Sequence, residues 1–287
     1  MKIATVLVNG SQRVGCISSD GSQVALLAQE WSDLVELIAA GIEPRDALSP
    51  ERPVPLSSLT LLAPIPRPRR NIMCVGKNYR EHAREFARSG YEAGAVVGKD
   101  VDDYPALFSK LPSSVIATGE KIQLHAAITQ KVDNDGELAV IIGRGGRGIP
   151  KPQAGDHIWG YTSVNDVTAR DLQKNHKQWF LGKSLDTFAP MGPWAVTADE
   201  VDATNLDLTC HVNGELRQHA NTKDLIFDIP TLIATLSAAI TLEPGDIIAT
   251  GTPAGVGIGL DPPAFLQPGD KIDIAISGIG TLSNVCT

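Results

Sequence analysis

An uninterrupted apolar run from Leu138 to Ile142 lies inside the segment KVDNDGELAVIIGR. Such a run predicts a strand that is buried on both of its faces. Acidic residues precede it. Because side chains alternate along a strand, Asp133, Asp135 and Glu137 are expected to share one face. The pattern therefore predicts a group of carboxylates at one end of a buried strand.

A second pattern follows in the segment GYTSVNDVTARDLQ. It predicts a strand from Tyr161 to about Asn165, then a polar interruption that contains Asp166. A helix that carries Arg170 and Gln173 is expected to begin directly after it. Both predicted strands thus end among polar residues that can face one another.

The acids Asp135, Glu137 and Asp166 leave two interpretations open. A buried carboxylate needs a cation, because an unpaired charge in an apolar setting is costly. An all-oxygen set without Cys or His suits Mg²⁺, with Mn²⁺ or Ca²⁺ as alternatives, rather than zinc. The other interpretation is a solvated acidic strand end that pairs with Arg144 or Arg170.

The remaining pattern predicts an α+β protein that is mainly β. Elements before residue 69 are strands near 2–8, 13–18 and 23–27, turns at Asn9-Gly10 and Asp20-Gly21, and a helix that Asp33 and Glu36 cap and Gly41 ends. A proline-rich segment then suits an extended connection. Later elements are a hairpin around Asn213-Gly214 and a helix from Pro230 to about Ile240. We therefore expect a small β-rich module over residues 1–69 and a second domain over residues 70–287.

A helix from about Tyr79 to Arg88 is predicted, with Asn78 and Glu81 as its capping box. His82 and Glu85 are three residues apart and would touch on one helical face. A carboxylate beside a His is the usual arrangement of a general base, and an exposed helix with charge pairs is the alternative. A glycine-rich loop follows to about residue 104 and predicts a lid or a disordered segment.

Three further positions bear on a site. Lys110 lies in the middle of a predicted strand pair, where a lysine is more often a surface residue than a ligand. Lys183, between two small residues, can bring a positive charge close to a backbone. Gly251 and Thr252 belong to a glycine-rich loop that lacks the ending of a P-loop, although its amides can hold a carboxylate.

Composition narrows the class of protein. The chain has 287 residues, of which 43% are hydrophobic and 20% charged, and its net charge is −8. This charge argues against nucleic acid and anionic membrane as partners, and no segment has the ~20 apolar residues of a membrane span. The cysteines are scattered, which predicts reduced thiols in a cytoplasmic protein. They are Cys16, Cys74, Cys210 and Cys286.

Six segments in order resemble successive motifs of one family. They are CVGKNYREHAREF, DGELAVIIG, VNDVTARDLQ, QWFLGKSLDTFAPMGPW, VNGELRQ and LEPGDIIATGTPAGVG. These segments are similar to motifs of the fumarylacetoacetate hydrolase superfamily, in its acylpyruvase and oxaloacetate decarboxylase-like branch. The resemblance is dense over residues 70–287 and looser over residues 1–69, the N-terminal module of the family. It implies a mixed β-sandwich roll, usually a homodimer, with one divalent metal per subunit.

The resemblance also implies roles for single residues. The implied metal ligands are Asp135, Glu137 and Asp166. The implied catalytic residues are His82, Glu85 and Lys183, of which the His-Glu pair activates water. The implied substrate-binding residues are Arg170, Gln173, Thr252, Gly251 and Lys110. The chain departs from the family's usual Glu-x-Glu at Asp135, whose side chain is one methylene shorter, so that a bridging water is an alternative to direct ligation.

The activity that the resemblance implies is hydrolysis of a C–C bond in an acylpyruvate or another 2,4-diketo acid, through a metal-stabilised enolate. The same enolate serves an oxaloacetate decarboxylase or an isomerase of unsaturated 2-oxo dicarboxylates, and these remain alternatives. A more distant alternative is a binding module without catalysis. In every enzymatic case the partner is a small 2-oxo acid.

Overall fold

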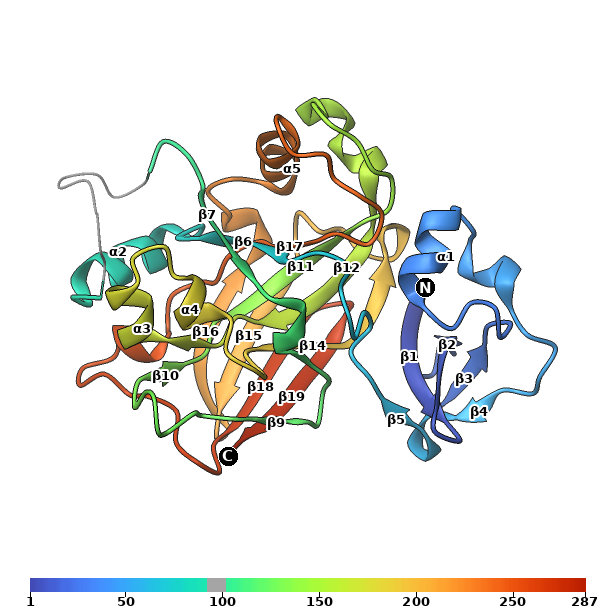
Figure 1. Ribbon diagram of the computed structural model, residues 1–287, viewed down its shortest axis with the longest axis horizontal. Coiled ribbons are helices and arrows are strands. Elements are labelled where there is room, and N and C mark those ends of the chain that lie inside the picture. Colours follow the sequence, from blue (N-terminus) through green and yellow to red (C-terminus); the bar gives the residue numbers. More distant parts are fainter. Residues whose placement is uncertain (92–101) are drawn as a thin grey trace.

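The computed structural model describes residues 1–91 and 102–287 (Figure 1). The glycine-rich loop that the sequence predicts as a lid falls largely on residues 92–101, outside the described residues. Within the described residues, twelve strands form one large sheet in the order β4-β3-β2-β1-β14-β12-β11-β17-β6-β7, with β5 on β1 and β8 on β14. Its strands are β1 (Lys2–Val8), β2 (Ser11–Ile17), β3 (Gln23–Leu26), β4 (Val54–Pro55), β5 (Thr60–Leu61), β6 (Ile72–Gly76), β7 (Ala106–Lys110), β8 (Val115–Ile116), β11 (Gly136–Ile142), β12 (Ile158–Asn165), β14 (Ala189–Thr197) and β17 (Ile247–Ala249).

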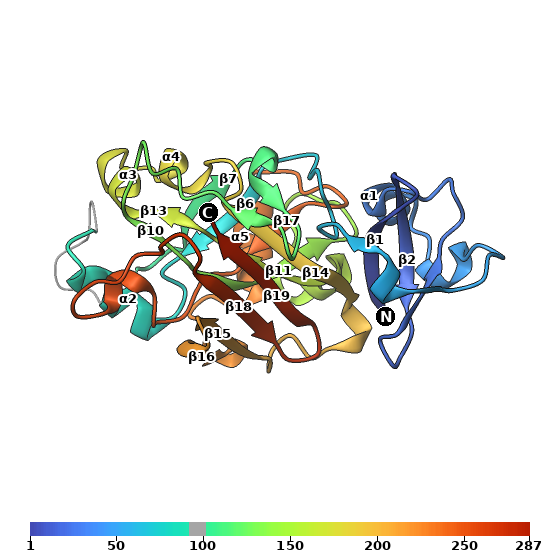
Figure 2. The ribbon, with the colours of Figure 1, turned by 90° about the horizontal axis from the view of Figure 1, so that it is seen from below.

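A second sheet and a short ladder complete the β structure. The five-stranded sheet runs β16-β15-β18-β19-β9, and β10 pairs with β13 alone. Their strands are β9 (Lys121–Ile122), β10 (Val132–Asp133), β13 (Thr168–Ala169), β15 (Asp207–Val212), β16 (Glu215–Asn221), β18 (Lys271–Ile276) and β19 (Gly280–Cys286). Figure 2 shows β18 and β19 lying across β11 and β14. This is the mainly β, α+β architecture that the sequence predicts.

Helices are few and short, and the structure groups three of them. The α-helices are α1 (Leu34–Ala40), α2 (Arg80–Arg88), α3 (Arg170–Asn175), α4 (Phe180–Lys183) and α5 (Ile229–Ser237). The 3₁₀ helices are Pro44–Ala47, Leu56–Ser58, Pro112–Ser114, Lys151–His157, Ala198–Glu200, Thr222–Asp224 and Gly257–Gly259. In both views α2, α3 and α4 lie together at one end of the molecule, and the strands of residues 1–61 lie at the other end (Figures 1 and 2).

Strand β11 explains why its sequence is an unbroken apolar run. Ala139 and Ile141 belong to a cluster that reaches α1, whereas Leu138, Val140 and Ile142 belong to a cluster that reaches α5 and β18. Both faces of the strand are therefore core, as the sequence predicts. Fully buried strands of this kind give a rigid support to whatever lies at their ends.

The N-terminal elements follow the prediction closely. β1, β2 and β3 form a meander, and Asp33 caps α1 by accepting from the Val35 amide. Gly41 ends the helix at φ 66°. Because β1 pairs with β14, these strands share the large sheet with the rest of the chain. A domain boundary at residue 69 stays a prediction.

Two local predictions are wrong. Asn78 does not cap α2, since its amide donates to the Phe227 and Thr250 carbonyls and ties the helix start to distant segments. The segment after β7 does not fold back on it as a strand pair. β7 pairs with β6 instead, while β8 pairs with β14 and β9 with β19. Long-range pairing decides both cases.

The cysteines and the apolar content of the helices bear on two predictions made from composition. All four cysteines are free, and three of them are buried. In the described part of the chain, no helix is both long and apolar enough to cross a membrane.

Candidate active site

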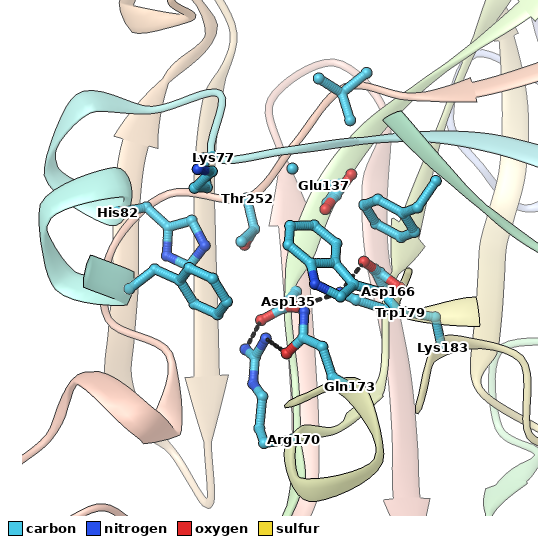
Figure 3. Close-up of a pocket in the computed structure, with 14 residues that line it drawn as sticks. Lys77, His82, Asp135, Glu137, Asp166, Arg170, Gln173, Trp179, Lys183 and Thr252 are labelled. Carbon is cyan, nitrogen blue, oxygen red and sulfur yellow. Dashed lines mark hydrogen bonds and ion pairs between the residues drawn. The ribbon is translucent and has the colours of Figure 1, made fainter. Parts of the chain in front are cut away.

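The site lies where β11 begins and β12 ends. These strands are antiparallel, and the Asp166 amide donates to the Asp135 carbonyl over 2.8 Å. Glu137 lies two residues further along β11. The three acids are at most 2% exposed and line one pocket (Figure 3). The fold thus brings together the acids that the sequence analysis groups as metal ligands.

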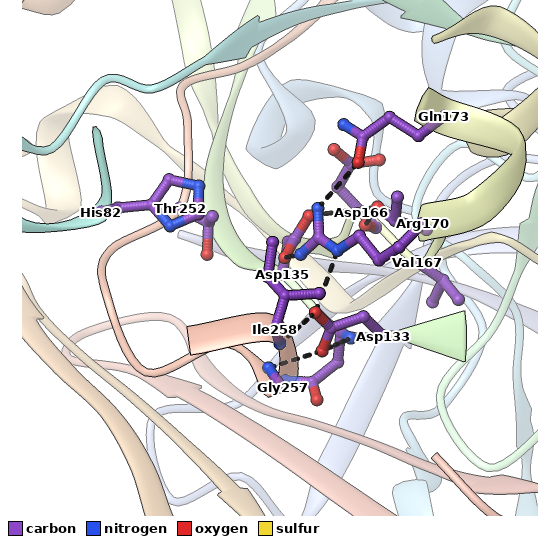
Figure 4. A network of polar contacts seen from close by, with 12 residues as sticks. His82, Asp133, Asp135, Asp166, Val167, Arg170, Gln173, Thr252, Gly257 and Ile258 are labelled. Atoms are coloured by element: carbon purple, nitrogen blue, oxygen red, sulfur yellow. Dashed lines mark hydrogen bonds and ion pairs between the residues drawn. The ribbon is translucent and has the colours of Figure 1, made fainter. Parts of the chain in front are cut away.

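The β10–β13 ladder places Arg170 beside these acids. Helix α3 begins at Arg170, directly after β13, as the sequence predicts. The guanidinium donates from Nε to Asp133 over 2.9 Å and from Nη2 to Asp135 over 2.5 Å, while Nη1 contacts the Gln173 amide oxygen at 3.3 Å (Figure 4). Burial by itself would lower the pKa of Arg170, but Asp135 and Asp133 raise it above its ordinary value. Arg170 is therefore a fixed, permanently charged group.

Asp133 does not share a face with Asp135 and Glu137. Residues 134 and 135 lie between β10 and β11 and interrupt the alternation of side chains. Asp133 instead accepts from the Gly257 and Ile258 amides over 2.7 and 3.2 Å, and it does not line the pocket (Figure 4). Burial raises the pKa of Asp133, although Arg170 opposes the rise.

Lys183 carries the second cation into the pocket from α4. A Cβ at Gly182 would lie 2.5 Å from the Gln173 backbone nitrogen, so glycine is what lets α4 approach α3. The Lys183 ammonium donates to Asp166 and, over 3.1 Å, to Asp135. Burial alone would lower the pKa of Lys183, but Asp166 and Asp135 raise it. The positive charge that the sequence predicts here therefore lies between two acids.

Lys110 is not a surface residue. It ends β7 fully buried and donates to Asp166 over 2.6 Å and to the Val167 carbonyl over 3.0 Å. The ammonium lies behind Asp166, outside the set of residues that line the pocket. Burial lowers the pKa of Lys110, although Asp166 opposes the fall. Lys110 is buried because β7 pairs with β6, which is far away in the sequence. The residues around Lys110 give no sign of this pairing.

The glycine loop, residues 251–259, holds three of the protein's own carboxylates by its backbone. The amides of Gly251, Gly255 and Gly257 each donate one hydrogen bond. Their acceptors are Glu137 at 2.8 Å, Glu85 at 2.9 Å and Asp133 at 2.7 Å. The prediction that amides of this loop hold a carboxylate is thus confirmed for internal side chains. Thr252 itself lines the pocket and donates to the Gly136 carbonyl.

Glu137 differs from Asp135 and Asp166 in its ion pairing, and from Asp135 in the direction of its pKa shift. Among residues 1–91 and 102–287 it takes part in no ion pair, whereas Asp135 and Asp166 each contact cations. Burial, and then the nearby Asp166 charge, raise the pKa of Glu137 well above its ordinary value. By contrast, Arg170 and Lys183 hold the pKa of Asp135 below its ordinary value, although burial raises it.

The pocket acids suit a divalent cation in their chemistry, because carboxylate oxygens are the ligands that Mg²⁺ prefers. Within the described residues, four buried carboxyl groups face three buried cations, and the raised pKa of Glu137 favours a proton on the carboxyl that has no cation partner. The groups concerned are Asp133, Asp135, Glu137 and Asp166 against Lys110, Arg170 and Lys183. As the described side chains stand, no three His, Cys, Asp or Glu converge on one point as metal ligands. Lys183 lies between Asp135 and Asp166, where it keeps them apart.

His82 and Glu85 meet on α2 as their spacing predicts. His82 Nδ1 lies 2.9 Å from Glu85 Oε2, and the other Glu85 oxygen accepts from Gly255. His82 is 4% exposed and lines the pocket, so the alternative of an exposed, charge-paired helix does not hold for this face. Because Nδ1 faces Glu85, Nε2 is the nitrogen that can meet a ligand.

An aromatic wall closes the pocket opposite the acids. It consists of Phe86 on α2, Phe108 on β7 and Trp179 between α3 and α4. Trp179 meets Phe86 and Phe108 edge-on, with ring centroids 5.8 and 5.3 Å apart. No local sequence pattern marks Phe86 or Phe108 as part of the site. For Trp179 the signal is its place in the QWFLGKS motif that carries Lys183.

Comparison with known proteins agrees with this geometry. The family described as Fumarylacetoacetate (FAA) hydrolase C-terminal matches residues 71–287. Oxaloacetate tautomerase YisK of Bacillus subtilis (strain 168) is 54% identical over 230 residues, which cover 80% of this chain and 73% of that protein.

Two solved structures extend the comparison to the whole chain. A fumarylacetoacetate hydrolase from Exiguobacterium antarcticum is 42% identical with a TM-score of 0.86, and it covers 100% of this chain and 99% of that one. Maleylpyruvate hydrolase from Sphingobium sp. SYK-6, in complex with manganese(II) ion and pyruvate, is 30% identical with a TM-score of 0.76 and the same coverage. From the ordered motifs, the fold and these likenesses together, the chain belongs to the fumarylacetoacetate hydrolase family.

Proposed function

We propose that this protein is a divalent-metal-dependent oxaloacetate tautomerase, an enzyme that interconverts the keto and enol forms of a 2-oxo diacid. The observation that carries the proposal is the pocket in which Asp135, Glu137 and Asp166 meet the cations Arg170 and Lys183. The likeness to a protein named as an oxaloacetate tautomerase, at 54% identity, supports the choice of substrate.

In this proposal Asp135, Glu137 and Asp166 hold Mg²⁺, with Mn²⁺ or Ca²⁺ as alternatives. A bound divalent ion supplies Lewis-acid stabilisation of negative charge on the 2-oxo oxygen. The buried Glu137 carboxyl supports a cation there, because a positive charge would offset the burial and the Asp166 charge that raise its pKa. The related maleylpyruvate hydrolase with manganese(II) ion and pyruvate supports both a divalent ion and a 2-oxo acid.

The chain's own residues have separate roles in the proposal. Arg170, which contacts Gln173, binds the carboxylate of the substrate, and Thr252 lines the same pocket on the His82 side. Lys183 stays protonated, because its pKa is raised, and stabilises the developing enolate oxygen. His82 removes the proton from C3 on the way to the enol and returns it to C3 on the way to the keto form, while the enolate oxygen exchanges its proton with solvent. The carboxylate of Glu85 orients the imidazole ring and stabilises its charged form. Gly251 acts indirectly through its bond to Glu137, and Lys110 through its bond to Asp166.

Hydrolysis of an acylpyruvate is the second candidate, and the His82–Glu85 contact is the observation that favours it. The same imidazole can activate a water for attack on the distal carbonyl of the substrate. Decarboxylation of oxaloacetate passes through the same enolate and needs no attacking water. The three reactions therefore differ in the role of His82: it transfers a proton at C3 in tautomerisation, activates water in hydrolysis, and activates no water in decarboxylation.

The test measures three reactions with the same Mn²⁺-loaded protein. They are loss of enol oxaloacetate by absorbance, release of pyruvate from oxaloacetate, and cleavage of acetylpyruvate. We expect tautomerisation to dominate and His82→Ala to lower it by about 10²–10⁴-fold. Lys183→Met should lower all three reactions. Glu81→Ala, an exposed position on the same helix, should change none of them.

The outcomes separate the candidates. If the wild-type protein removes enol oxaloacetate no faster than buffer does, the tautomerase proposal fails. Efficient acetylpyruvate cleavage that His82→Ala abolishes would establish the hydrolase instead. Full tautomerisation by His82→Ala would remove His82 from the proton transfer.

The location, the partner and the assembly of the protein are also part of the proposal. The free cysteines support a cytoplasmic location, where thiols stay reduced. The net charge of −8 supports a small acid rather than nucleic acid or an anionic membrane as the partner. A homodimer is the assembly that we expect, and sedimentation equilibrium measures it.

A further inference from the structure

Trp179 occupies an unusual position between the two helices that carry the cationic residues. It follows α3 and precedes α4, and its backbone has a φ of 68° in the left-handed region, as does Lys177 at 51°. A bulky side chain rarely adopts this conformation without a reason in the surrounding structure. Figure 3 shows the indole among Asp135, Asp166 and Gln173, and all four residues line the pocket.

Gly76 on β6 makes room for this indole. A Cβ on residue 76 would lie 2.6 Å from Cζ3 of Trp179, closer than two carbon atoms can come. The indole therefore lies directly on the strand backbone and makes edge contacts with Phe86 and Phe108. Side chains or backbone of β6, β7 and α2 therefore all contact the Trp179 indole.

The pocket behind the indole is too small for a substrate as it stands. It encloses about 20 Å³, and one water molecule needs ~10–15 Å³. A 2-oxo acid that reaches the acids therefore lies against the aromatic wall or displaces part of it. The acid side of the pocket is held by buried ion pairs, Phe86 is 2% exposed within α2, and Phe108 belongs to the β6–β7 ladder. Trp179 is half-buried and lies at the start of α4, outside the strand ladders and the helix interiors, so of these wall elements it is the one held by the fewest backbone hydrogen bonds.

The two walls of the pocket also differ in chemistry. The acids, Arg170 and Lys183 can hold the carboxylate and 2-oxo groups of a substrate, so its distal group must point at the aromatic wall. We propose that the Trp179 indole is the wall that contacts this distal group and that its bulk restricts the enzyme to 2-oxo acids with a short distal group. This inference rests on the proposed function and names the residue that sets its substrate range.

Two substrates of different distal size test the inference. Oxaloacetate carries a single distal carboxylate and phenylpyruvate a phenyl ring, and the enol of each is followed by absorbance. We expect Trp179→Ala to raise the kcat/KM ratio of phenylpyruvate to oxaloacetate by about 10–100-fold, the range that steric fit gives in an apolar pocket. Gly76→Ala should shift the ratio in the same direction by displacing the indole. A ratio that stays within about twofold of wild type in Trp179→Ala overturns the inference.

A binding measurement keeps this result separate from the proposed activity. Pyruvate is titrated into the Mn²⁺-loaded protein while tryptophan emission is recorded. We expect an emission change in the wild type and in Trp31→Phe, a tryptophan outside the pocket, but not in Trp179→Phe. If oxaloacetate is not turned over but this pattern holds, the tautomerase proposal fails and the contact with Trp179 stands. An equal emission change in Trp179→Phe contradicts the contact.

Discussion

Glu137 is the acid whose charge the described part of the chain leaves without an ion pair. Burial and Asp166 raise its pKa well above the ordinary value of 4.5, and the Lys183 charge and the Gly251 amide oppose this only in part. The folded, metal-free protein therefore binds this proton more tightly than the unfolded chain does. The stability that results is fully present below pH 4.5. It declines as the pH rises from there towards the folded pKa.

Glu137→Gln should remove this pH dependence, because a neutral amide has no proton to lose. In metal-free protein, we expect the variant to gain stability relative to wild type as the pH rises from about 5 to about 8. Each unit of pKa difference is worth about 1.4 kcal/mol. Urea unfolding at several pH values measures it, with the exposed Glu81→Gln as control. Parallel stability curves for Glu137→Gln and wild type would show that Glu137 is ionised in the folded protein.

At the scale of elements, Asp133 joins three of them. It belongs to the short β10–β13 ladder, pairs with Arg170 at the start of α3, and accepts from Gly257 and Ile258 in the glycine loop. The same loop holds Glu85 through Gly255. The orientation of Arg170 and the orientation of the His82–Glu85 pair therefore depend on one set of hydrogen bonds.

Asp133→Asn should weaken this junction, because an amide cannot accept from both the guanidinium and two backbone amides. Removal of one partner from a buried ion pair costs about 3–5 kcal/mol, and Asp135 keeps the loss near the lower end. We also expect a higher KM for oxaloacetate. Chemical unfolding and steady-state kinetics measure both effects.

Asp246→Asn is the matched control, since Asp246 is a buried acid paired with Arg70 away from the pocket. It should lower stability without a change in KM. An equal rise of KM in both variants would mean that general destabilisation, and not the Asp133 junction, affects the site.

At the scale of the whole molecule, metal binding should appear as stability. A ligand at 100 times its Kd adds about 2.7 kcal/mol to the free energy of unfolding, and a domain of this size gains roughly 2–4 °C per kcal/mol. We therefore expect Mn²⁺ to raise the Tm of chelator-treated protein by several degrees. Differential scanning calorimetry measures the shift.

Variants assign the shift to the site. Asp166→Ala and Glu137→Ala should abolish it, because they remove proposed ligands. Asp135→Glu should retain or increase it if residue 135 binds the ion directly. A full shift in Asp166→Ala would overturn the proposed metal site, and no shift in the wild type would favour a protein without a bound metal.

Features of this protein that depend on neighbours along the chain are predictable without its structure. The apolar run of β11, the Asp33 cap of α1 and the contact between His82 and Glu85 follow from strand or helix periodicity. The ordered motifs determined the family. These features need only local geometry, because an interval of two or three residues fixes which side chains share a face.

Only the tertiary structure decided how distant segments use these residues. Asp133 accepts a hydrogen bond from the glycine loop, and Lys110 is buried against Asp166. Asn78 bonds Phe227 and does not cap the helix. The tertiary structure also brought Trp179 onto Gly76. Each of these contacts joins residues that are more than fifty positions apart. They are set by strand pairing and by the shortage of other partners for buried polar groups, and no local pattern encodes either.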